Sequence, residues 1–430
     1  MNSFSFFNKF PNLKNSLRWT LILILLSILI AHSVALFLYL LDWVTIIRQN
    51  NNWLIYLLPI AGLIIYWSYH RWCESCANGN LLILNELQSS KNFVKPLLAP
   101  LIFFTTLITH LVGGSAGREG TAIQMGGGIS GGLMRFFKLN DEEKQSLLRS
   151  SIAAGFGAVF GTPLAASVFA LEIQKPYQFK LSTVLSCLFS AYLAHYICLL
   201  VGAEHTNYQI SSILPKLATP TTIVLVGKVI LFGVWAGLAA TLFCFMTDFL
   251  KEKSKTYLVY PQLIPVVGSV LIIGISALLG NNDYLGIGVY TSNSNGISIV
   301  NAFTNHNQTY WAWLYKLVLT VITLSMGFKG GEVTPLFFIG ATLGNTFATI
   351  FGCPIDLFAA FGFISVFAGA SNAPVASTLV GVELFGYQFS FYFMLVCFVS
   401  YVFSGKNGIY YSSEFNFKSK IKLILSRLRI

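Results

Sequence analysis

The sequence predicts an all-α protein that crosses a membrane many times. Hydrophobic residues make up 55% of its 430 residues and charged residues only 10%, whereas a soluble domain carries about 25% charged residues. The chain therefore has too little charge to cover a water-facing surface. The same composition excludes a disordered chain, a coiled coil and a small disulfide-rich scaffold.

Apolar runs follow one another along the chain, and crossing the hydrocarbon core takes about 20 residues. The runs are 19–41, 53–69, 97–116, 150–171, 181–203, 221–247, 262–282, 312–327, 333–355 and 358–403. The last run is long enough for two helices, with Pro374 at its centre. Proline and glycine interrupt several runs, as at Pro163 and Gly340. Spans that face only lipid do not need such breaks, and broken helices are tolerated where protein or a water-filled cavity satisfies the freed backbone groups.

Lysine and arginine gather in alternate loops, and the net charge is 27 − 16 = +11. The basic segments are 1–18, 86–96, 135–149, 175–180, 251–255 and the tail 412–430. By contrast, 281–311 has no lysine or arginine and 203–220 has only Lys216. Cytoplasmic loops carry the excess of basic residues. We therefore expect a multi-pass protein of the cell membrane with both termini in the cytoplasm, and we expect no nucleic-acid partner.

The chain contains a weak internal repeat. The segment near 153–172 reads AAGFGAVFGTPLAASVFALE, and the segment near 367–383 reads FAGASNAPVASTLVGVE. Four residues match at one offset (367 − 156 = 211), and the pairs are Phe156/Phe367, Pro163/Pro374, Ala165/Ala376 and Glu172/Glu383. This predicts two repeats, 19–203 and 221–411, flanked by a cytoplasmic segment 1–18 and the tail. Transporters with inverted repeats bind their substrate where the repeats meet.

Each half also has a glycine-rich segment that contains a glutamate and opens an apolar helix. Residues 113–121 read GGSAGREGT, and residues 327–335 read GFKGGEVTP. Backbone N–H groups at a helix N-terminus bind anions, and Pro335 suits the first turn. Two such helices aimed at one place would form a dehydrated anion pocket, with Gly117, Arg118 and Gly120 on the first-half side.

Glu119 is the candidate for proton coupling, because a carboxylate inside a membrane is a functional candidate by default. When ionised, it could take the anion's place against the N–H groups; when protonated, it could swing away with a proton. The alternative is that Glu119 and Glu332 only complement the helix dipole. Glu172 and Glu383 end apolar stretches, and for them snorkelling or structural pairing is the preferred interpretation.

In order along nearly the whole chain, these segments resemble the CLC family of chloride channels and proton/anion antiporters. The resemblance rests on GREG at 117–120, the segment 153–172, the helix start at 330–335 and a C-terminal tyrosine. It implies the CLC fold with inverted repeats of tilted and broken helices, and a homodimer with one pathway per subunit. It implies no cofactor and no metal.

Within that family, the details resemble the fluoride/proton antiporter branch, CLC-F. The second helix start reads GGEVTP, where chloride-type members read GGIFAP or similar. The resemblance therefore gives Glu332 a role in proton coupling or gating and gives Thr334 a role in anion binding. Chloride/proton exchangers carry a further glutamate at the position of Ile173, so their proton route is in doubt here.

Two other positions are assigned by the same resemblance. The chloride-type motif GSGIP is missing, and its place is taken by CANGNL at 76–81, where Asn80 or Asn78 could donate an amide N–H. The family's pore tyrosine best matches Tyr410, with Tyr411 as the alternative.

Fluoride is small and strongly hydrated, so stripping its water is costly and the replacement donors must be dense. A protonated glutamate could donate to it directly. We therefore expect a secondary transporter that exports fluoride in exchange for protons. A chloride/proton antiporter and a passive anion channel on the same scaffold remain alternatives.

Two further patterns carry other interpretations. GGSAG at 113–117 fits G-x-S-x-G, with His110 five residues before Ser115, but a nucleophile elbow needs a strand–turn–helix context, so we expect no enzyme. The cysteines number seven, which argues against a disulfide framework. Cys73-x-x-Cys76 has redox or metal spacing but lacks a second ligand pair, so no metal site is expected.

Overall fold

The computed structural model describes residues 11–89, 94–173, 180–212, 220–291, 293, 295–304, 309–405 and 408–410. The basic tail 412–430 lies outside the described residues, as do Tyr411, Lys91, Lys175 and Lys216. The predictions that rest on these positions therefore stay predictions.

Helices build the described part of the chain, which contains no extended strand. The α-helices are α1 (Pro11–Asn50), α2 (Leu58–Trp72), α3 (Asn80–Ser89), α4 (Leu98–Leu111), α5 (Glu119–Phe137), α6 (Asp141–Phe160), α7 (Pro163–Glu172), α8 (Leu181–Leu200), α9 (Pro220–Tyr257), α10 (Leu263–Leu279), α11 (Ile299–Ala302), α12 (Ala312–Ser325), α13 (Val333–Phe351), α14 (Ile355–Ser371), α15 (Pro374–Phe385) and α16 (Ser390–Phe403). Short 3-10 helices are η2 (Asn52–Leu57), η3 (Glu74–Asn78) and η4 (Tyr387–Phe389).

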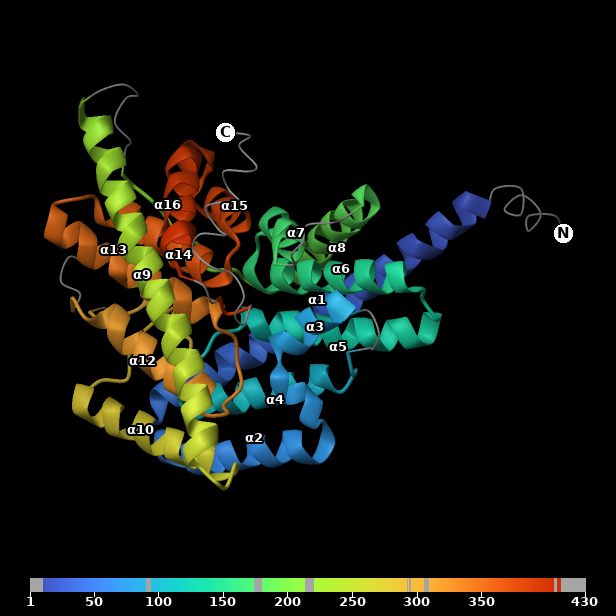
Figure 1. Cartoon of the computed structure of the whole chain (residues 1–430), viewed down its shortest axis with the longest axis horizontal. Helices are drawn as coiled ribbons and strands as arrows, with labels where there is room; N and C mark the ends of the chain where they lie inside the picture. The colour runs from blue at the N-terminus through green and yellow to red at the C-terminus, as the bar shows by residue number, and fades with distance from the viewer. Residues whose placement is uncertain are drawn as a thin grey trace.

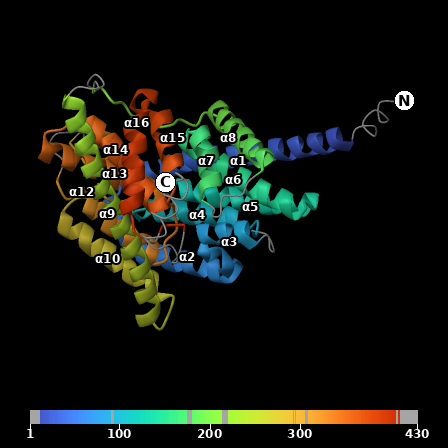
Figure 2. The same cartoon turned by 45° about the horizontal axis from the view of Figure 1, so that its top comes forward.

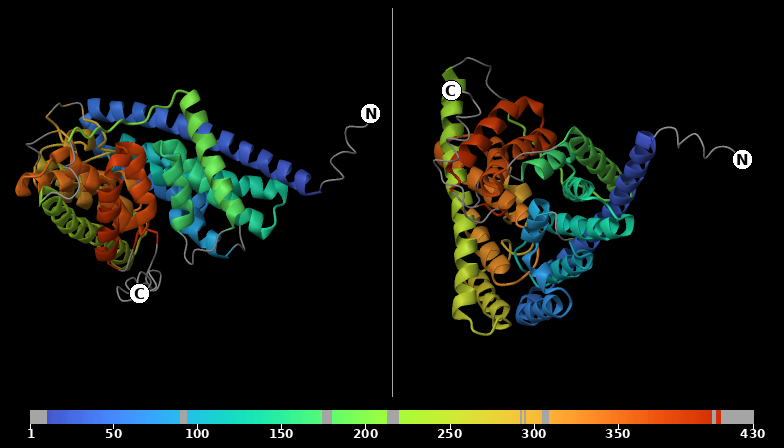
Figure 3. Two further views of the ribbon diagram at one scale, coloured as in Figure 1. Left: turned by 90° about the horizontal axis from the view of Figure 1, so that it is seen from above. Right: turned by 45° about the vertical axis from the view of Figure 1, so that its right-hand side comes forward.

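The helices form two groups that lie side by side. The blue-to-green helices α1–α8 occupy one side in Figure 1, and α9–α16 occupy the other. The same division is visible after rotation in Figure 2. In Figure 3, the long helix α1 runs along the first group, and α9 stands at the edge of the second. The two groups touch through α7 and α15, through α2 and α10, and through α5 and α13.

Within each group, two central helices pack backbone to backbone. A Cβ on Gly340 of α13 would lie 2.0 Å from the carbonyl oxygen of Gly362 in α14. A Cβ on Gly155 of α6 would lie 2.6 Å from the carbonyl oxygen of Ala122 in α5. In a membrane, where lipid tails are as apolar as leucine, such small residues let helices approach closely. The close packing of α5 on α6 and of α13 on α14 therefore fixes the positions of the two glycine-rich segments, at which α5 and α13 begin.

Two apolar runs divide differently from the expectation. The run 150–171 is split between α6 and α7 at Pro163, which opens α7 at a position where its missing N–H costs nothing. The run 358–403 holds three helices, α14, α15 and α16, so the expected two was wrong. Pro374 makes the first break as predicted. The second break is at Gly386, whose φ of +103° is open to glycine and strained for other residues.

A pair of glutamates joins the two groups at α7 and α15. At the end of α7, Glu172 accepts backbone N–H groups of Val375 (3.1 Å) and Ala376 (2.7 Å) at the start of α15. In return, Glu383 of α15 accepts the N–H groups of residues 164 and 165 at the start of α7, at 3.0 and 2.7 Å. Each carboxylate therefore caps the other helix and meets its positive end.

Five helical segments in the described residues are long and apolar enough to cross a membrane. They are Asn15–Asn50, Asn52–Trp72, Leu181–Leu200, Thr222–Tyr257 and Val333–Phe351. The last of these is 89% buried within the protein, whereas the others are between 39% and 56% buried. Helix α13 is therefore an interior helix, and the site described below lies at its N-terminus.

Candidate anion and proton site

The two glycine-rich segments meet through their backbones. The N–H of Gly117 donates to the carbonyl oxygen of Gly331 (2.6 Å), and the N–H of Gly331 donates to that of Gly117 (2.8 Å). A Cβ on Gly117 would lie 2.8 Å from Pro335 Cδ and 2.9 Å from Thr334 Oγ1. Glycine is thus required here for the close approach that brings the start of α5 against the start of α13.

Glu119 reaches from the first turn of α5 to the N-terminus of α13. Its Oε2 accepts both the backbone N–H of Thr334 (3.0 Å) and the Thr334 hydroxyl (2.5 Å). The side chain is fully buried, and its other oxygen, Oε1, has no hydrogen-bond partner among the described residues. Arg118 Nε lies 3.7 Å from Oε1. The carboxylate therefore occupies the place where N–H groups and the helix dipole favour an anion.

A second carboxylate stands at the same helix start. Glu332 is the N-cap residue of α13, and its Oε2 accepts the side-chain N–H of Asn80 at 3.2 Å. Gly120 lies next to this pair, since a Cβ there would meet Gly331 Cα at 2.9 Å and Asn80 Nδ2 at 3.1 Å. The structure thus places Asn80, at the start of α3, against Glu332.

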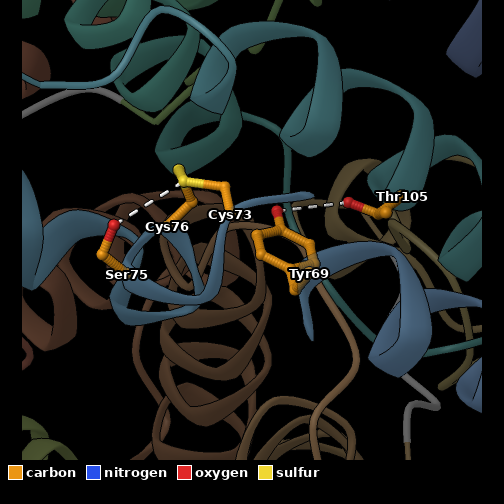
Figure 4. Close-up of a disulfide and its surroundings, with 5 residues drawn as sticks. All are labelled: Tyr69, Cys73, Ser75, Cys76 and Thr105. Atoms are coloured by element: carbon orange, nitrogen blue, oxygen red, sulfur yellow. Dashed lines mark hydrogen bonds between the residues drawn. A yellow bond between two sulfur atoms is a disulfide. The ribbon is translucent and has the colours of Figure 1, made fainter. Parts of the chain in front are cut away.

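The turn before Asn80 is closed by a disulfide between Cys73 and Cys76, both of which are buried. The odd cysteine count argued against a disulfide framework, and the structure adds this one local bridge among the described residues, which the sequence analysis did not predict. Figure 4 shows the bridge together with Ser75, whose hydroxyl lies 3.7 Å from Cys73 Sγ. In the sequence, the spacing of these two cysteines suggested a redox or metal site, and a metal site was not expected because no second pair of ligands accompanies them.

The second group also holds this turn. Lys329, in the loop before α13, donates from Nζ to the carbonyl oxygen of Ala77 (3.0 Å). Its ammonium group lies over the Tyr69 ring, 4.6 Å from the centroid. Figure 4 shows the Tyr69 hydroxyl pointing to Thr105 of α4, 3.4 Å away. These contacts fix η3, and with it the start of α3, relative to Glu332.

Tyr410 is buried, and its hydroxyl has no hydrogen-bond partner in the described part of the chain. Its ring packs edge-on against Phe169 (5.6 Å between centroids), which in turn contacts Phe367 (5.8 Å). Phe337, three residues after Thr334, stacks on Phe363 at 4.1 Å. Phe337 also packs against Phe367. Sequence reasoning missed this aromatic cluster, because phenylalanine is common throughout the apolar runs.

The residues predicted from the sequence are therefore placed as follows. Gly117, Arg118, Glu119, Gly120, Glu332, Thr334 and Asn80 come together where α5 and α13 begin. Tyr410 makes no hydrogen bond to this group, and its ring contacts Phe169.

Ser115 has no nucleophile-elbow setting. It follows helix α4, its hydroxyl lies 2.8 Å from the Thr320 hydroxyl, and its N–H donates to the Thr323 hydroxyl at 3.1 Å. These contacts tie the first glycine-rich segment to α12.

Known proteins are similar to this chain over most of its length. A family model described as "Voltage gated chloride channel" matches residues 61–405. The "Chloride/fluoride channel protein" of Pseudomonas syringae pv. tomato is 37% identical over 398 residues, which cover 92% of this chain and 86% of that protein. The "H(+)/Cl(-) exchange transporter ClcA" of Vibrio parahaemolyticus is 25% identical over 345 residues, covering 76% of this chain and 70% of that protein.

Solved structures are similar over almost the whole chain. The crystal structure of a CLC-type fluoride/proton antiporter has a TM-score of 0.84 and 31% identity, and it covers 91% of this chain and 96% of that one. A slow cyanobacterial Cl⁻/H⁺ antiporter has a TM-score of 0.76 and 18% identity, covering 96% and 99%. The fold prediction is confirmed by these similarities.

Proposed function

The chain belongs to the voltage-gated chloride channel (CLC) family, and from this premise we propose that it is an antiporter that exports fluoride in exchange for protons. The family places it among membrane transport proteins. The fluoride assignment is supported by similarity to a CLC-type fluoride/proton antiporter and to a chloride/fluoride channel protein.

One observation carries the proposal: the Glu119 carboxylate accepts two hydrogen bonds from Thr334 at the start of α13. These donors, one N–H and one hydroxyl, suit a small anion equally well. An ionised Glu119 and an anion therefore compete for them. Protonation removes the charge that holds the side chain there, so the protonated Glu119 leaves, and the anion takes its place.

This competition couples the two movements. A proton that binds Glu119 frees the Thr334 donors, and a fluoride ion that binds them keeps the side chain away until it loses its proton elsewhere. Arg118, whose Nε lies 3.7 Å from the carboxylate, stabilises either negative charge at this place. Gly117 and Gly120 leave room for the close backbone approach.

We assign Glu332 a supporting part in the same cycle. It stands two residues before Thr334, and Asn80 holds one of its oxygens. When protonated, Glu332 can donate to fluoride, which is a strong acceptor. Tyr410, whose buried hydroxyl has no partner among the described residues, offers a further donor beyond the phenylalanine cluster.

The wider architecture is part of the proposal. Two inverted repeats, 19–203 and 221–411, are supported by the paired helix starts at Glu119 and Glu332 and by the mutual capping of α7 and α15. The distribution of basic residues supports cytoplasmic termini. Family resemblance implies a homodimer with one pathway per subunit.

Purified protein in liposomes tests the function directly. An imposed fluoride gradient should drive protons in the opposite direction, uphill against a pH gradient, with fluoride and pH recorded together. A matched control is Glu252→Gln, which removes an exposed carboxylate of α9 and should leave coupling unchanged. Fluoride flux that follows voltage alone, with no proton movement, would support a passive channel instead.

Chloride as the exported ion is the second candidate, since chloride/proton exchangers are among the similar proteins. Liposomes that contain both halides distinguish the two. We expect fluoride to be exported while chloride is retained; equal export of both would contradict the assignment.

A further inference from the structure

A polar cavity lies apart from the central site, between the end of α1 and the loop that follows α10. Its volume is about 320 Å³. Lining residues include Arg48, Asn52, His110, Asn282, Asp283 and Tyr290. One water takes up about 30 Å³ of the liquid, so the cavity can hold a small ion with several waters. The distribution of basic residues assigns the 281–311 loop, and thus this cavity, to the outside of the membrane.

Arg48 brings to the cavity a buried positive charge that forms no ion pair with any described residue. Its side chain is only 6% exposed, and Nε and Nη2 have no hydrogen-bond partner within the described ranges. Nη1 makes two long contacts, to Asn51 O (3.5 Å) and Asn52 Oδ1 (3.4 Å). No ion pair joins Arg48 to a carboxylate in this part of the chain. Such a charge is costly unless something pairs with it.

The acidic residue in the lining is already committed elsewhere. Asp283 Oδ2 accepts the backbone N–H of Ile297 (2.8 Å), and Oδ1 accepts the Thr291 hydroxyl (3.3 Å). These bonds hold the loop in shape. Asp283 therefore bonds within its own loop and makes no ion pair with Arg48.

Two further polar side chains lie at or behind the cavity wall. His110 is 1% exposed, and neither ring nitrogen has a partner in the described residues. Lys316 lies fully buried behind the wall, where Nζ donates to the carbonyl oxygens of Tyr284 (3.1 Å) and Gly286 (2.7 Å). Gly286 is itself a lining residue. Lys316 thus brings a second basic side chain to this region besides Arg48, while Asp283 is the one acidic residue among the described lining residues.

Gly113 links the cavity to the central site, because it contacts Arg48 and belongs to the glycine-rich segment that contains Glu119. A Cβ on Gly113 would lie 2.8 Å from Arg48 Nε, so the guanidinium packs directly against this glycine, whose φ is +87°. The same segment leads to Arg118 and Glu119, and the N–H of Gly113 donates to the carbonyl oxygen of His110. An ion held by Arg48 would thus rest on the loop that positions the coupling glutamate.

We propose that this cavity is a second anion site, which binds a hydrated monovalent anion of halide size through the Arg48 guanidinium. It is separate from the site at Thr334, and it does not depend on which ion the protein exports. Because the anion keeps most of its water, the site should discriminate little between halides.

Crystals of the full chain soaked in bromide, measured at the bromine absorption edge, test the site without any substitution. We expect an anomalous peak within hydrogen-bonding distance of the Arg48 guanidinium, with occupancy that saturates as bromide rises. A cavity without a peak overturns the inference, as does a peak that only grows in proportion to bromide, which would mean an adventitious ion only. Bromide at Thr334 with an empty outer cavity would overturn the inference and leave the proposed function standing.

Substitutions then test the role of the charge. Arg48→Gln should lower bromide affinity at the cavity roughly tenfold or more, the usual effect of losing a hydrogen bond to a charged group. Arg48→Lys keeps the charge and should retain part of the binding, and the exposed control Arg71→Gln should retain all of it. Unchanged bromide binding in Arg48→Gln would contradict the proposal. If Arg48→Gln fails to fold, the wild-type soak and Arg48→Lys still decide it.

Discussion

Two pairs of glutamates join the halves of this protein, and they are bonded in different ways. In the pair Glu172 and Glu383, both oxygens of each carboxylate accept a backbone N–H from the opposite helix. In the pair Glu119 and Glu332, the bonds are unequal. Glu119 holds Thr334 with one oxygen while its other oxygen has no hydrogen-bond partner in the described chain, and Glu332 meets a side-chain amide.

The difference shows that a carboxylate at a helix N-terminus can serve two purposes. All four carboxylates meet a helix start, their own or that of a neighbouring helix, where a negative charge is favoured. A carboxylate that satisfies two N–H groups with two oxygens cannot leave without stranding buried donors. When the Glu119 side chain moves away, it leaves two donors without a partner, both on Thr334, and a small anion can accept both hydrogen bonds. We therefore interpret the first pair as structural and the second as the exchanging pair.

The largest effect expected from this comparison concerns stability. Glu172→Ala should lower the free energy of unfolding by about 3 kcal/mol or more, because two charge-assisted bonds are lost and two N–H groups are stranded at the start of α15. Thermal unfolding in detergent would measure the loss. Glu119→Ala is the matched case, and with fluoride present it should cost clearly less. Equal losses in the two variants would remove the distinction between the pairs.

The next effect concerns the donors of Thr334. Thr334→Val removes the hydroxyl and keeps the shape, so fluoride affinity measured by calorimetry should fall roughly tenfold or more. Thr342→Val is the control, because that buried hydroxyl on the same helix donates to the carbonyl oxygen of Phe338. A similar loss in both variants would mean that the substitutions only disturb α13.

The smallest effect concerns the amide beside Glu332. Asn80→Ala removes its hydrogen bond to Glu332. A hydrogen bond contributes about 1 kcal/mol, and a loss of that size in the transport cycle corresponds to about fivefold in coupled transport rate. Asn78→Ala should change the rate little, which distinguishes the two asparagines that the sequence left open. A larger loss in Asn78→Ala would reverse the assignment.

The sequence allowed the exchanging pair to be predicted better than the structural one. Glycine around Glu119 and Glu332 marked two helix starts, and the resemblance supplied Thr334, Asn80 and the family. Mutual capping by Glu172 and Glu383 was not predictable, because spacing along the chain does not reveal which helix start a distant carboxylate will meet.

Arg48 and the phenylalanine cluster were also missed. Arg48 stands at the end of a long apolar run, where an arginine ordinarily faces water, and only the fold encloses it against Gly113. The prolines predicted helix boundaries correctly, because Pro163 and Pro374 are each the first residue of a helix. Gly386 did not stand out from the other glycines, so the third helix in 358–403 was not expected.

The pH dependence of fluoride binding tests the central claim most directly, because the claim is that carboxylate and anion compete for the same donors. A lower proton concentration favours the carboxylate form, which competes with fluoride. Fluoride affinity of the wild-type protein should therefore fall as the pH rises, because fluoride binding then requires the uptake of a proton. In Glu119→Gln this dependence should be largely lost, while Glu252→Gln should behave as wild type. Wild-type affinity that does not change with pH, or a Glu119→Gln variant with the full wild-type slope, would contradict the account.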